Sequence, residues 1–198
     1  MDIYQVKLVF TEPLLGTAPL NKELYGDYIQ TKAADPLATM DEQDTLSCDE
    51  MTEKGTTGFH RLDGMPILYD YVIKGFFKDA CGMLTRVPDS GSHALKAYRK
   101  VIDGLAFIEP RRIPIIVVGE IGILERPLRA QTAQGERIAL ARSEMIEPGS
   151  SIAFAVLCLG QIKESLLREW FEYGALRGLG QWRNANYGRF AYEMERRA

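Results

Sequence analysis

A glycine-rich stretch near the C-terminus holds the residue types that suit recognition of a nucleic-acid strand. It combines glycines, amides, arginines and aromatic rings: Gly178, Gly180, Gly188, Gln181, Asn184, Asn186, Arg183, Arg189, Trp182 and Tyr187. Glycine lets backbone N–H groups approach an anion closely, so Gly178 and Gly180 are candidates for an anion-binding nest. Arginine and a flat indole suit a phosphate and an unstacked base. A glycine-rich turn that binds no ligand explains the same composition equally well.

Two lysines on a predicted helix offer further phosphate contacts. The apolar residues of 72–84 recur at helical spacing and leave Lys74, Gly75, Lys78 and Gly82 on the opposite side. Lys74 and Lys78 are four residues apart, so their ammonium groups are neighbours, and the glycines add no bulk beside them. The alternative is an ordinary solvent-facing helix surface.

Arginines line a predicted hairpin over residues 125–141, whose turn lies near 133–135. Its flanks carry Arg126, Arg129, Arg137 and Arg142. If these arginines, the two lysines and the C-terminal loop converge, they form one continuous positive furrow.

The remaining periodicities predict the framework that positions these groups. Alternation and apolar runs indicate strands at residues 1–10, 66–69, 113–118, 151–159 and 188–194. The first is expected to be interior and the fourth to be central and covered on both faces. Helical spacing indicates helices at 92–102, capped by Ser90 or Ser92, and at 162–175, ending at Gly174 or Gly178. This order predicts an α+β, modified ferredoxin-like (RRM-like) fold, an antiparallel sheet with helices on one face.

Acidic residues concentrate in one segment. From Thr11 to Glu53, ten acidic residues stand against two lysines, so the segment carries −8 and the rest of the chain, whose total is −3, carries +5. Residues 11–58 also lack periodicity, which predicts an inserted lobe or flexible loop within a single domain of residues 1–198. Because acidic and basic parts are segregated, the overall acidity says little about nucleic-acid affinity.

The cysteines and the lengths of the apolar runs indicate in which cellular compartment the protein is expected. Cys48, Cys81 and Cys158 are odd in number, widely spaced and without a CxxC pair, which favours reduced thiols in a cytoplasmic protein. No apolar run approaches the roughly 20 residues of a membrane-spanning helix.

Three segments together resemble the repeat-associated mysterious protein (RAMP) superfamily. Residues 71–80, with Lys74, Gly75 and Lys78, are similar to the Lys-Gly-x-x-Arg/Lys opening of that superfamily's first helix. Residues 126–150 resemble its central hairpin, and residues 178–190 its C-terminal glycine-rich loop. The order of the motifs along the chain carries the resemblance. The chain also resembles stand-alone relatives carried by bacterial phages and prophages.

The resemblance implies a place near the backbone subunits of CRISPR effector complexes, which bind guide RNA along its phosphates. It implies that Lys74 and Lys78 contact phosphate, that the loop 178–188 cradles the strand, and that residues 11–58 occupy the place of an inserted lobe. The chain departs from that pattern in its short length. Its inserted segment is also acidic, where a strand-gripping lobe would be basic.

Some RAMP proteins cleave RNA without a metal, using a histidine with lysine or tyrosine as acid and base. Of the two histidines here, His60 precedes the first predicted helix and is the candidate, with Lys74 as a potential neighbour, whereas His93 is expected on the surface. The sequence has no HxxE or HExxH motif, no Walker-type lysine after its glycines and no Gly-x-Ser-x-Gly. No metal or cofactor is therefore expected, and catalysis is disfavoured.

Three hypotheses follow from the sequence. The first is a non-catalytic protein that binds single-stranded nucleic acid, RNA rather than DNA, alone, by self-association along the strand or beside other ribonucleoprotein subunits. Its expected contacts are Lys74, Lys78, Arg126, Arg129, Arg137, Gly178, Gly180, Trp182, Arg183 and Arg189. The second is a protein-interaction module, such as a phage-borne anti-defence protein that acts on a host ribonucleoprotein through the acidic segment. The third is a metal-independent endoribonuclease that uses His60.

Overall fold

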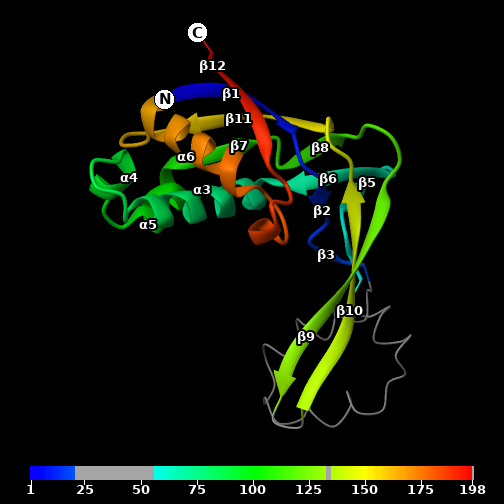
Figure 1. Ribbon diagram of the computed structural model, residues 1–198. Coiled ribbons are helices and arrows are strands. Elements are labelled where there is room, and N and C mark those ends of the chain that lie inside the picture. The colour runs from blue at the N-terminus through cyan, green and yellow to red at the C-terminus, as the bar shows by residue number, and fades with distance from the viewer. Residues whose placement is uncertain (21–55, 133–134, 198) are drawn as a thin grey trace, which may run out of the picture. The chain divides into compact units, whose positions relative to one another are not determined.

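The structure, a computed structural model, describes residues 1–20, 56–132 and 135–197, and only the backbone at 128–132 and 135–139 (Figure 1). The chain folds into two compact units. The first consists of Met1–Leu15, His60–Glu120 and Ile146–Ala198, and the second of Gly16–Phe59 and Ile121–Met145. The chain therefore leaves the first unit twice and returns to it twice.

Within the described residues, a seven-stranded antiparallel sheet is the framework of the first unit (Figure 1). In spatial order its strands are β12 (Phe190–Arg196), β1 (Asp2–Phe10), β11 (Ser151–Cys158), β8 (Arg112–Ile116), β6 (Met65–Tyr69) and β5 (His60–Leu62), with β7 (Ala106–Glu109) also paired to β11. β1 lies between β11 and β12, where Leu8 is opposite Ile152 and Tyr192. The predicted interior strand at residues 1–10 is confirmed.

Among the described residues, helices cover one face of this sheet, and no helix covers the other. Along β1 every second residue from Tyr4 to Phe10 is buried, whereas Gln5 and Lys7 are exposed. α3 (Asp70–Leu84) and α6 (Glu164–Arg177) lie on the buried side (Figure 1). The predicted antiparallel sheet with helices on one face is thus present in this unit.

The central position predicted for residues 151–159 is confirmed, but their cover on both faces is wrong. β11 pairs with β1, β7 and β8, yet Ala153 on its open face is exposed. Alanines on that face look apolar in the sequence, but a methyl group gains little from cover, so it does not require a second layer.

Aromatic side chains join the two long helices. The ring of Phe77 from α3 lies 5.2 Å from that of Trp170 and 5.4 Å from that of Phe171, both from α6. All three are fully buried, which contributes about 1.5–3 kcal/mol each relative to exposure. The Trp170 indole nitrogen donates to the Ser92 hydroxyl at 3.0 Å, so the buried polar groups satisfy each other.

The helix predicted at residues 92–102 is wrong as a single element. Two short helices form instead, α4 (Gly91–Ala94) and α5 (Tyr98–Leu105), and Ala97 between them adopts a left-handed conformation with φ of 51°. The chain changes direction there so that α5 packs against α3 and runs directly into β7. Tertiary packing overrides the good helix propensity of this stretch.

The predicted cap of that segment is confirmed at Ser90. Its hydroxyl accepts the backbone N–H of His93 at 3.0 Å. The Glu169 carboxylate of α6 accepts the N–H groups of Gly91 at 2.7 Å and Ser92 at 3.1 Å. The first N–H groups of α4 are therefore satisfied by side chains, as a helix start requires.

Of the two glycines predicted to end the last helix, one does so. Gly178 is the C-cap of α6 and has a φ of 85°, a conformation that glycine adopts without strain. Gly174 is buried within α6, and a Cβ there would lie 2.5 Å from the Phe76 ring. Gly174 is thus a packing position, and its prediction as a helix stop is wrong.

A long hairpin forms most of the described part of the second unit. β9 (Gly122–Thr132) pairs antiparallel with β10 (Gly135–Ile146), and Thr132 is opposite Gly135. This confirms the predicted hairpin, and residues 133–134 of its predicted turn lie outside the described residues. β3 (Ala18–Pro19) pairs with β4 (Thr57–Gly58), which runs parallel to β10 at Ser143. Of the predicted 11–58 insertion, residues 21–55, with nearly all its acidic groups, lie outside the described residues.

Cys81 and Cys158 are free and fully buried. Burial raises the pKa of the Cys158 thiol to about 12 and also raises the pKa of Cys81, so both thiols stay protonated at neutral pH. Cys48 lies outside the described residues. In the part of the chain that the structure describes, no helix is long and apolar enough to cross a membrane.

Candidate nucleic-acid interface

Both predicted lysines of α3 contact one aspartate of α5. The Lys78 ammonium lies 2.5 Å from the Asp103 carboxylate, and the Lys74 ammonium donates to the Asp103 carbonyl oxygen at 3.3 Å. Lys74 also lies 4.9 Å from the ring centroid of Phe107, a cation–π distance. The lysines share one face of α3 as predicted, but Asp103 offsets part of their charge.

The two glycines of this helix face differ in what surrounds them. Gly75 is exposed and has open space where a Cβ would project. At Gly82 a Cβ would lie 2.6 Å from the Tyr98 hydroxyl of α5. The prediction of a bare surface therefore holds at Gly75 and is wrong at Gly82, where the missing side chain admits a tyrosine.

The two ends of the glycine-rich loop pack against each other and against Pro13. Leu179 donates its N–H to the Gly188 carbonyl at 2.9 Å, and Gly188 donates to the Pro13 carbonyl at 2.8 Å. A Cβ on Gly178 would overlap the Tyr187 carbonyl oxygen, and one on Gly188 would overlap that of Leu179. These glycines let two arms of the loop touch, which favours the ligand-free explanation for them.

The predicted anion nest loses one of its two N–H groups. Gly178 donates to the Gly174 carbonyl at 2.7 Å and so completes the hydrogen bonding of α6. Gly180 has a φ of 84°, and a Cβ there would lie 3.1 Å from the Leu15 carbonyl oxygen. The Gly178 N–H is therefore used within α6, and an anion-binding nest at these two glycines stays a prediction.

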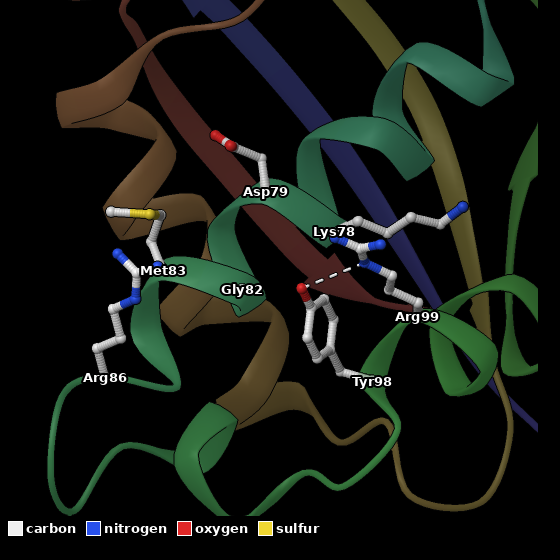
Figure 2. Close-up of a pocket in the computed structure, with 7 residues that line it drawn as sticks. All are labelled: Lys78, Asp79, Gly82, Met83, Arg86, Tyr98 and Arg99. Carbon is white, nitrogen blue, oxygen red and sulfur yellow. Dashed lines mark hydrogen bonds between the residues drawn. The ribbon is translucent and has the colours of Figure 1, made fainter.

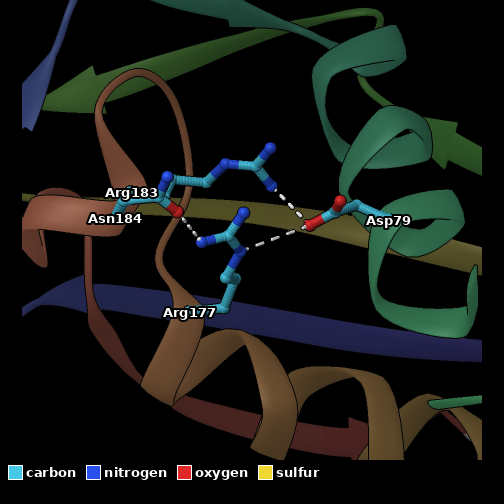
Figure 3. Close-up of polar contacts among 4 residues, drawn as sticks. All are labelled: Asp79, Arg177, Arg183 and Asn184. Carbon is cyan, nitrogen blue, oxygen red and sulfur yellow. Dashed lines mark hydrogen bonds and ion pairs between the residues drawn. The ribbon is translucent and has the colours of Figure 1, made fainter. Parts of the chain in front are cut away.

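An aspartate of α3 holds the loop to the helix (Figure 3). Asp79 forms an ion pair with Arg183 of the loop at 2.6 Å and lies 3.8 Å from the Nε of Arg177, at the end of α6. Arg177 also donates to the Asn184 side-chain oxygen. Since Asp79 follows Lys78 directly, the structure brings predicted contacts from two distant segments to one helix.

Of the other predicted loop residues, Arg189 makes a structural hydrogen bond, whereas Trp182 is exposed. The Arg189 guanidinium donates to the Leu176 carbonyl at 2.8 Å, which satisfies a carbonyl in the last turn of α6. Trp182 and Tyr187 stack on each other, with centroids 5.1 Å apart and 9° between their planes, and Trp182 is 42% exposed. A base would therefore meet the outer face of a ring pair.

The predicted hairpin arginines belong to the second unit. Arg126 is half-buried and lies opposite Ala141. In register, Arg129 is opposite Ile138 and Arg137 is opposite Ala130, and the side chains of these two arginines lie outside the described part of the structure. Of the predicted contacts in the first unit, Arg183 is tied through Asp79 to α3, the helix that carries Lys74 and Lys78.

His60 belongs to an aromatic cluster that the sequence analysis missed. Its ring meets Tyr69 edge-on at 4.9 Å, and Tyr69 stacks on Tyr71 at 5.4 Å with 13° between the planes. Tyr71 is 57% exposed and lies three residues before Lys74 on α3. Two tyrosines that flank the start of a basic helix were the available signal. His93 is exposed as predicted.

Among the described residues, the central strands β1 and β11 present no aromatic side chain on the open face of the sheet. Phe107 of the neighbouring strand β7, opposite Leu157, is exposed there, and the Lys74 ammonium lies over its ring. The central strands present Gln5, Lys7 and Ala153 there, and none of these offers a ring for a base to stack on. β12 adds exposed Glu193 and Glu195, whose carboxylates repel phosphate. The helical side of the first unit is thus the better candidate surface. Across the described ranges, no group of three or more His, Cys, Asp and Glu is placed to hold a metal ion.

Comparison with known proteins shows similarity at the level of fold. No protein-family model and no curated protein matches the sequence. The chain is similar to one in the structure of the type III-B Cmr-beta complex bound to cognate target RNA, with 12% identity and a TM-score of 0.54, covering 98% of this chain and 60% of that one. It is also similar to a chain of a type IV-B CRISPR complex, with 9% identity, a TM-score of 0.46 and coverage of 98% and 90%. The fold thus resembles that of the Cmr-beta chain over nearly the whole of this chain, which spans 60% of the length of that one.

Proposed function

We propose that the protein binds single-stranded RNA without cleaving it and is related to the RAMP subunits that form the backbone of CRISPR effector complexes. The ion pair between Asp79 and Arg183 is the main support, because it holds the glycine-rich loop beside the helix that carries Lys78. Phosphate contacts from the helix and a stacking ring from the loop then lie within one unit. The Cmr-beta complex, whose chain shares this fold, is bound to target RNA.

The charges of this surface fit a phosphate backbone. Lys78 pairs with the Asp103 carboxylate, and Arg177 and Arg183 pair with that of Asp79. Lys74 donates to the Asp103 backbone carbonyl, so these four cations face two carboxylates and keep a net positive charge. If all four neutralise phosphates of a single strand, the logarithm of affinity should fall against the logarithm of salt concentration with a slope of about −3.

Binding to a fluorescein-labelled single-stranded RNA, measured by anisotropy over a salt titration, tests the proposal directly. The expected result is saturable binding with the salt slope given above, and an RNA length that is unchanged after incubation. The absorbance ratio at 260 and 280 nm of the purified protein, before and after nuclease treatment, provides a second test. Absence of binding at low salt would refute the proposed function.

Asp103→Asn is expected to tighten RNA binding about two- to fivefold at low salt. The change removes the carboxylate next to Lys78, and exposed ion pairs of this kind are worth about 0–1 kcal/mol. Glu195→Gln is the matched control, since it removes one negative charge from the open face of the sheet. Equal effects of the two variants would mean that net charge alone acts and that α3 is not the contact surface.

Tyr71→Ala is expected to weaken RNA binding by roughly five- to 150-fold, because stacking on an aromatic ring contributes about 1–3 kcal/mol per base. The exposed outer face of the Tyr69–Tyr71 stack, beside Lys74, is the reason for choosing this residue. Tyr71→Phe keeps the ring and should bind as the wild type does. A strand without bases cannot stack, so Tyr71→Ala and Tyr71→Phe should bind it with equal affinity. If Tyr71→Ala bound this abasic strand more weakly than Tyr71→Phe does, a stacking role for Tyr71 would be contradicted.

The acidic segment supports a second candidate function, docking on a basic protein partner. Residues 11–53 carry a net charge of −8, enough to imitate a nucleic acid electrostatically. Nuclease-treated protein that still captures the same basic partner from host lysate, with a deletion of residues 21–55 abolishing capture, would support it. Recovery of nucleic acid without a protein partner would argue against it.

A further inference from the structure

A pocket of about 480 Å³ lies at the C-terminal end of α3 (Figure 2). Its lining comes from α3, the residues that follow it and the first turn of α5: Lys78, Asp79, Gly82, Met83, Arg86, Tyr98 and Arg99. In Figure 2 Arg86 lies on one side of Gly82, and Tyr98 and Arg99 lie on the other.

The two arginines of this pocket differ from the other cations nearby. Asp79 is occupied by Arg183 and Arg177, and Lys78 is paired with Asp103. Within the described residues, no carboxylate forms an ion pair with Arg86 or Arg99. The Asp79 carboxylate also lines the pocket, but it is paired with Arg183 and Arg177. The guanidinium groups of Arg86 and Arg99 therefore favour an anionic ligand, and their planar donor pairs match phosphate oxygens.

A tyrosine hydroxyl adds a neutral donor to the same pocket. The Arg99 Nε donates to the Tyr98 hydroxyl oxygen at 3.4 Å, which leaves the hydroxyl proton for another acceptor. Gly82 makes this position possible, because a Cβ there would lie 2.6 Å from the hydroxyl oxygen and 3.2 Å from the ring carbon that bears it. Glycine at this position therefore keeps the hydroxyl at the pocket wall.

We infer that this pocket binds a terminal phosphate, the dianionic monoester of a phosphorylated strand end or of a mononucleotide. A monoester carries about −1.5 to −2 charges and three acceptor oxygens, which suits two unpaired arginines and a hydroxyl better than the single charge of an internal phosphodiester does. In its strand-end form the inference rests on the proposed function, because Lys78 belongs to both the α3 surface and the pocket.

Anisotropy competition with one RNA sequence in three forms tests the inference: with a 5′-phosphate, with a 3′-phosphate and with hydroxyl groups at both ends. The wild type should bind one phosphorylated form about tenfold more tightly than the hydroxyl form, as expected for one or two charge-assisted hydrogen bonds. Arg86→Gln/Arg99→Gln should abolish this preference. The control Arg111→Gln/Arg112→Gln, at exposed residues outside the pocket, should retain it.

Gly82→Ala provides a second variant, which changes the pocket without changing any charge. Its methyl group would displace the Tyr98 hydroxyl, so the preference should fall while the melting temperature reports on folding. Titration with adenosine monophosphate, followed by calorimetry, separates the two sources of the phosphate. If adenosine monophosphate displaces the phosphorylated RNA at concentrations similar to those at which the RNA itself binds, the ligand of the pocket is the free nucleotide. If the protein prefers the phosphorylated RNA but the mononucleotide does not displace it, the ligand is the strand end.

The failures of the two proposals can be told apart. Equal affinity for all three RNA forms, with no mononucleotide binding, would overturn the pocket inference and leave RNA binding intact. Mononucleotide binding that depends on Arg86 and Arg99, without binding of any strand, would support the pocket and refute the proposed function.

Discussion

Replacing Lys74 and Lys78 together with glutamate should weaken single-stranded RNA binding by at least about 100-fold at low salt. Each lysine lost removes a charge-assisted contact worth about 1.5–3 kcal/mol, and the new carboxylates repel the phosphates. The two lysines share one face of α3, so one strand meets both. Anisotropy titration of the double variant against the wild type measures the loss.

The salt dependence of the same variant separates contact from general repulsion. Removing two phosphate contacts should reduce the magnitude of the salt slope by about 1.4 for a single strand. Lys74→Gln/Lys78→Gln should show the same change in slope with a smaller loss of affinity, since it adds no repulsion.

The control is Lys7→Glu/Lys163→Glu, which makes the same charge change at two exposed residues away from α3. It should retain most of the affinity and the full salt slope. If both double variants lose affinity equally, or the α3 variant keeps the wild-type slope, then α3 is not the surface that binds the strand.

Gly188→Ala should lower the free energy of unfolding by about 3 kcal/mol or more and weaken RNA binding as well. At Gly188 φ is 72°, a region that costs other residues about 1–2 kcal/mol. The added methyl group would also overlap the Leu179 carbonyl oxygen, and overpacking typically costs about 1–3 kcal/mol. Because the loop would shift, Trp182 and Arg183 should lose their positions. Urea denaturation measures the stability loss.

Gly119→Ala is the matched control for this effect. Gly119 has a similar φ of 77°, but a Cβ there has nothing within 4 Å. The free energy of unfolding of this variant should fall only by the conformational cost of about 1–2 kcal/mol, and its RNA affinity should not change. Equal losses in the two variants would mean that the loop tolerates the methyl group and that its close packing is unimportant.

Local patterns predicted most of the framework of the first unit. The alternation in residues 1–10 placed β1 correctly, and helical spacing placed both ends of α3 and of α6 to within two residues. The break at Ala97 was missed because alanine rarely adopts a left-handed conformation, and only the packing of α5 on α3 requires it there. Local sequence also gives no sign that the open face of β11 lacks a cover.

The candidate site was predictable where it depends on spacing along one helix. The four-residue separation of Lys74 and Lys78 sufficed to place both on one face. Their partner Asp103, and the pairing of Asp79 with Arg183 across 104 positions, depend on the tertiary fold and leave no local pattern. The loop glycines were ambiguous for a physical reason: close approach to a ligand and close approach to the chain itself demand the same residue.

The short pairing of β3 with β4 has a consequence for the acidic segment. Ala18 is opposite Gly58 and Pro19 is opposite Thr57, and Leu20 donates to the Thr56 carbonyl at 3.2 Å. Residues directly opposite in an antiparallel pair lie about 4.5–5.5 Å apart, a span that a two-residue turn closes. We therefore expect a change in the number of residues between Leu20 and Thr56 to leave the pairing of β3 with β4 in place.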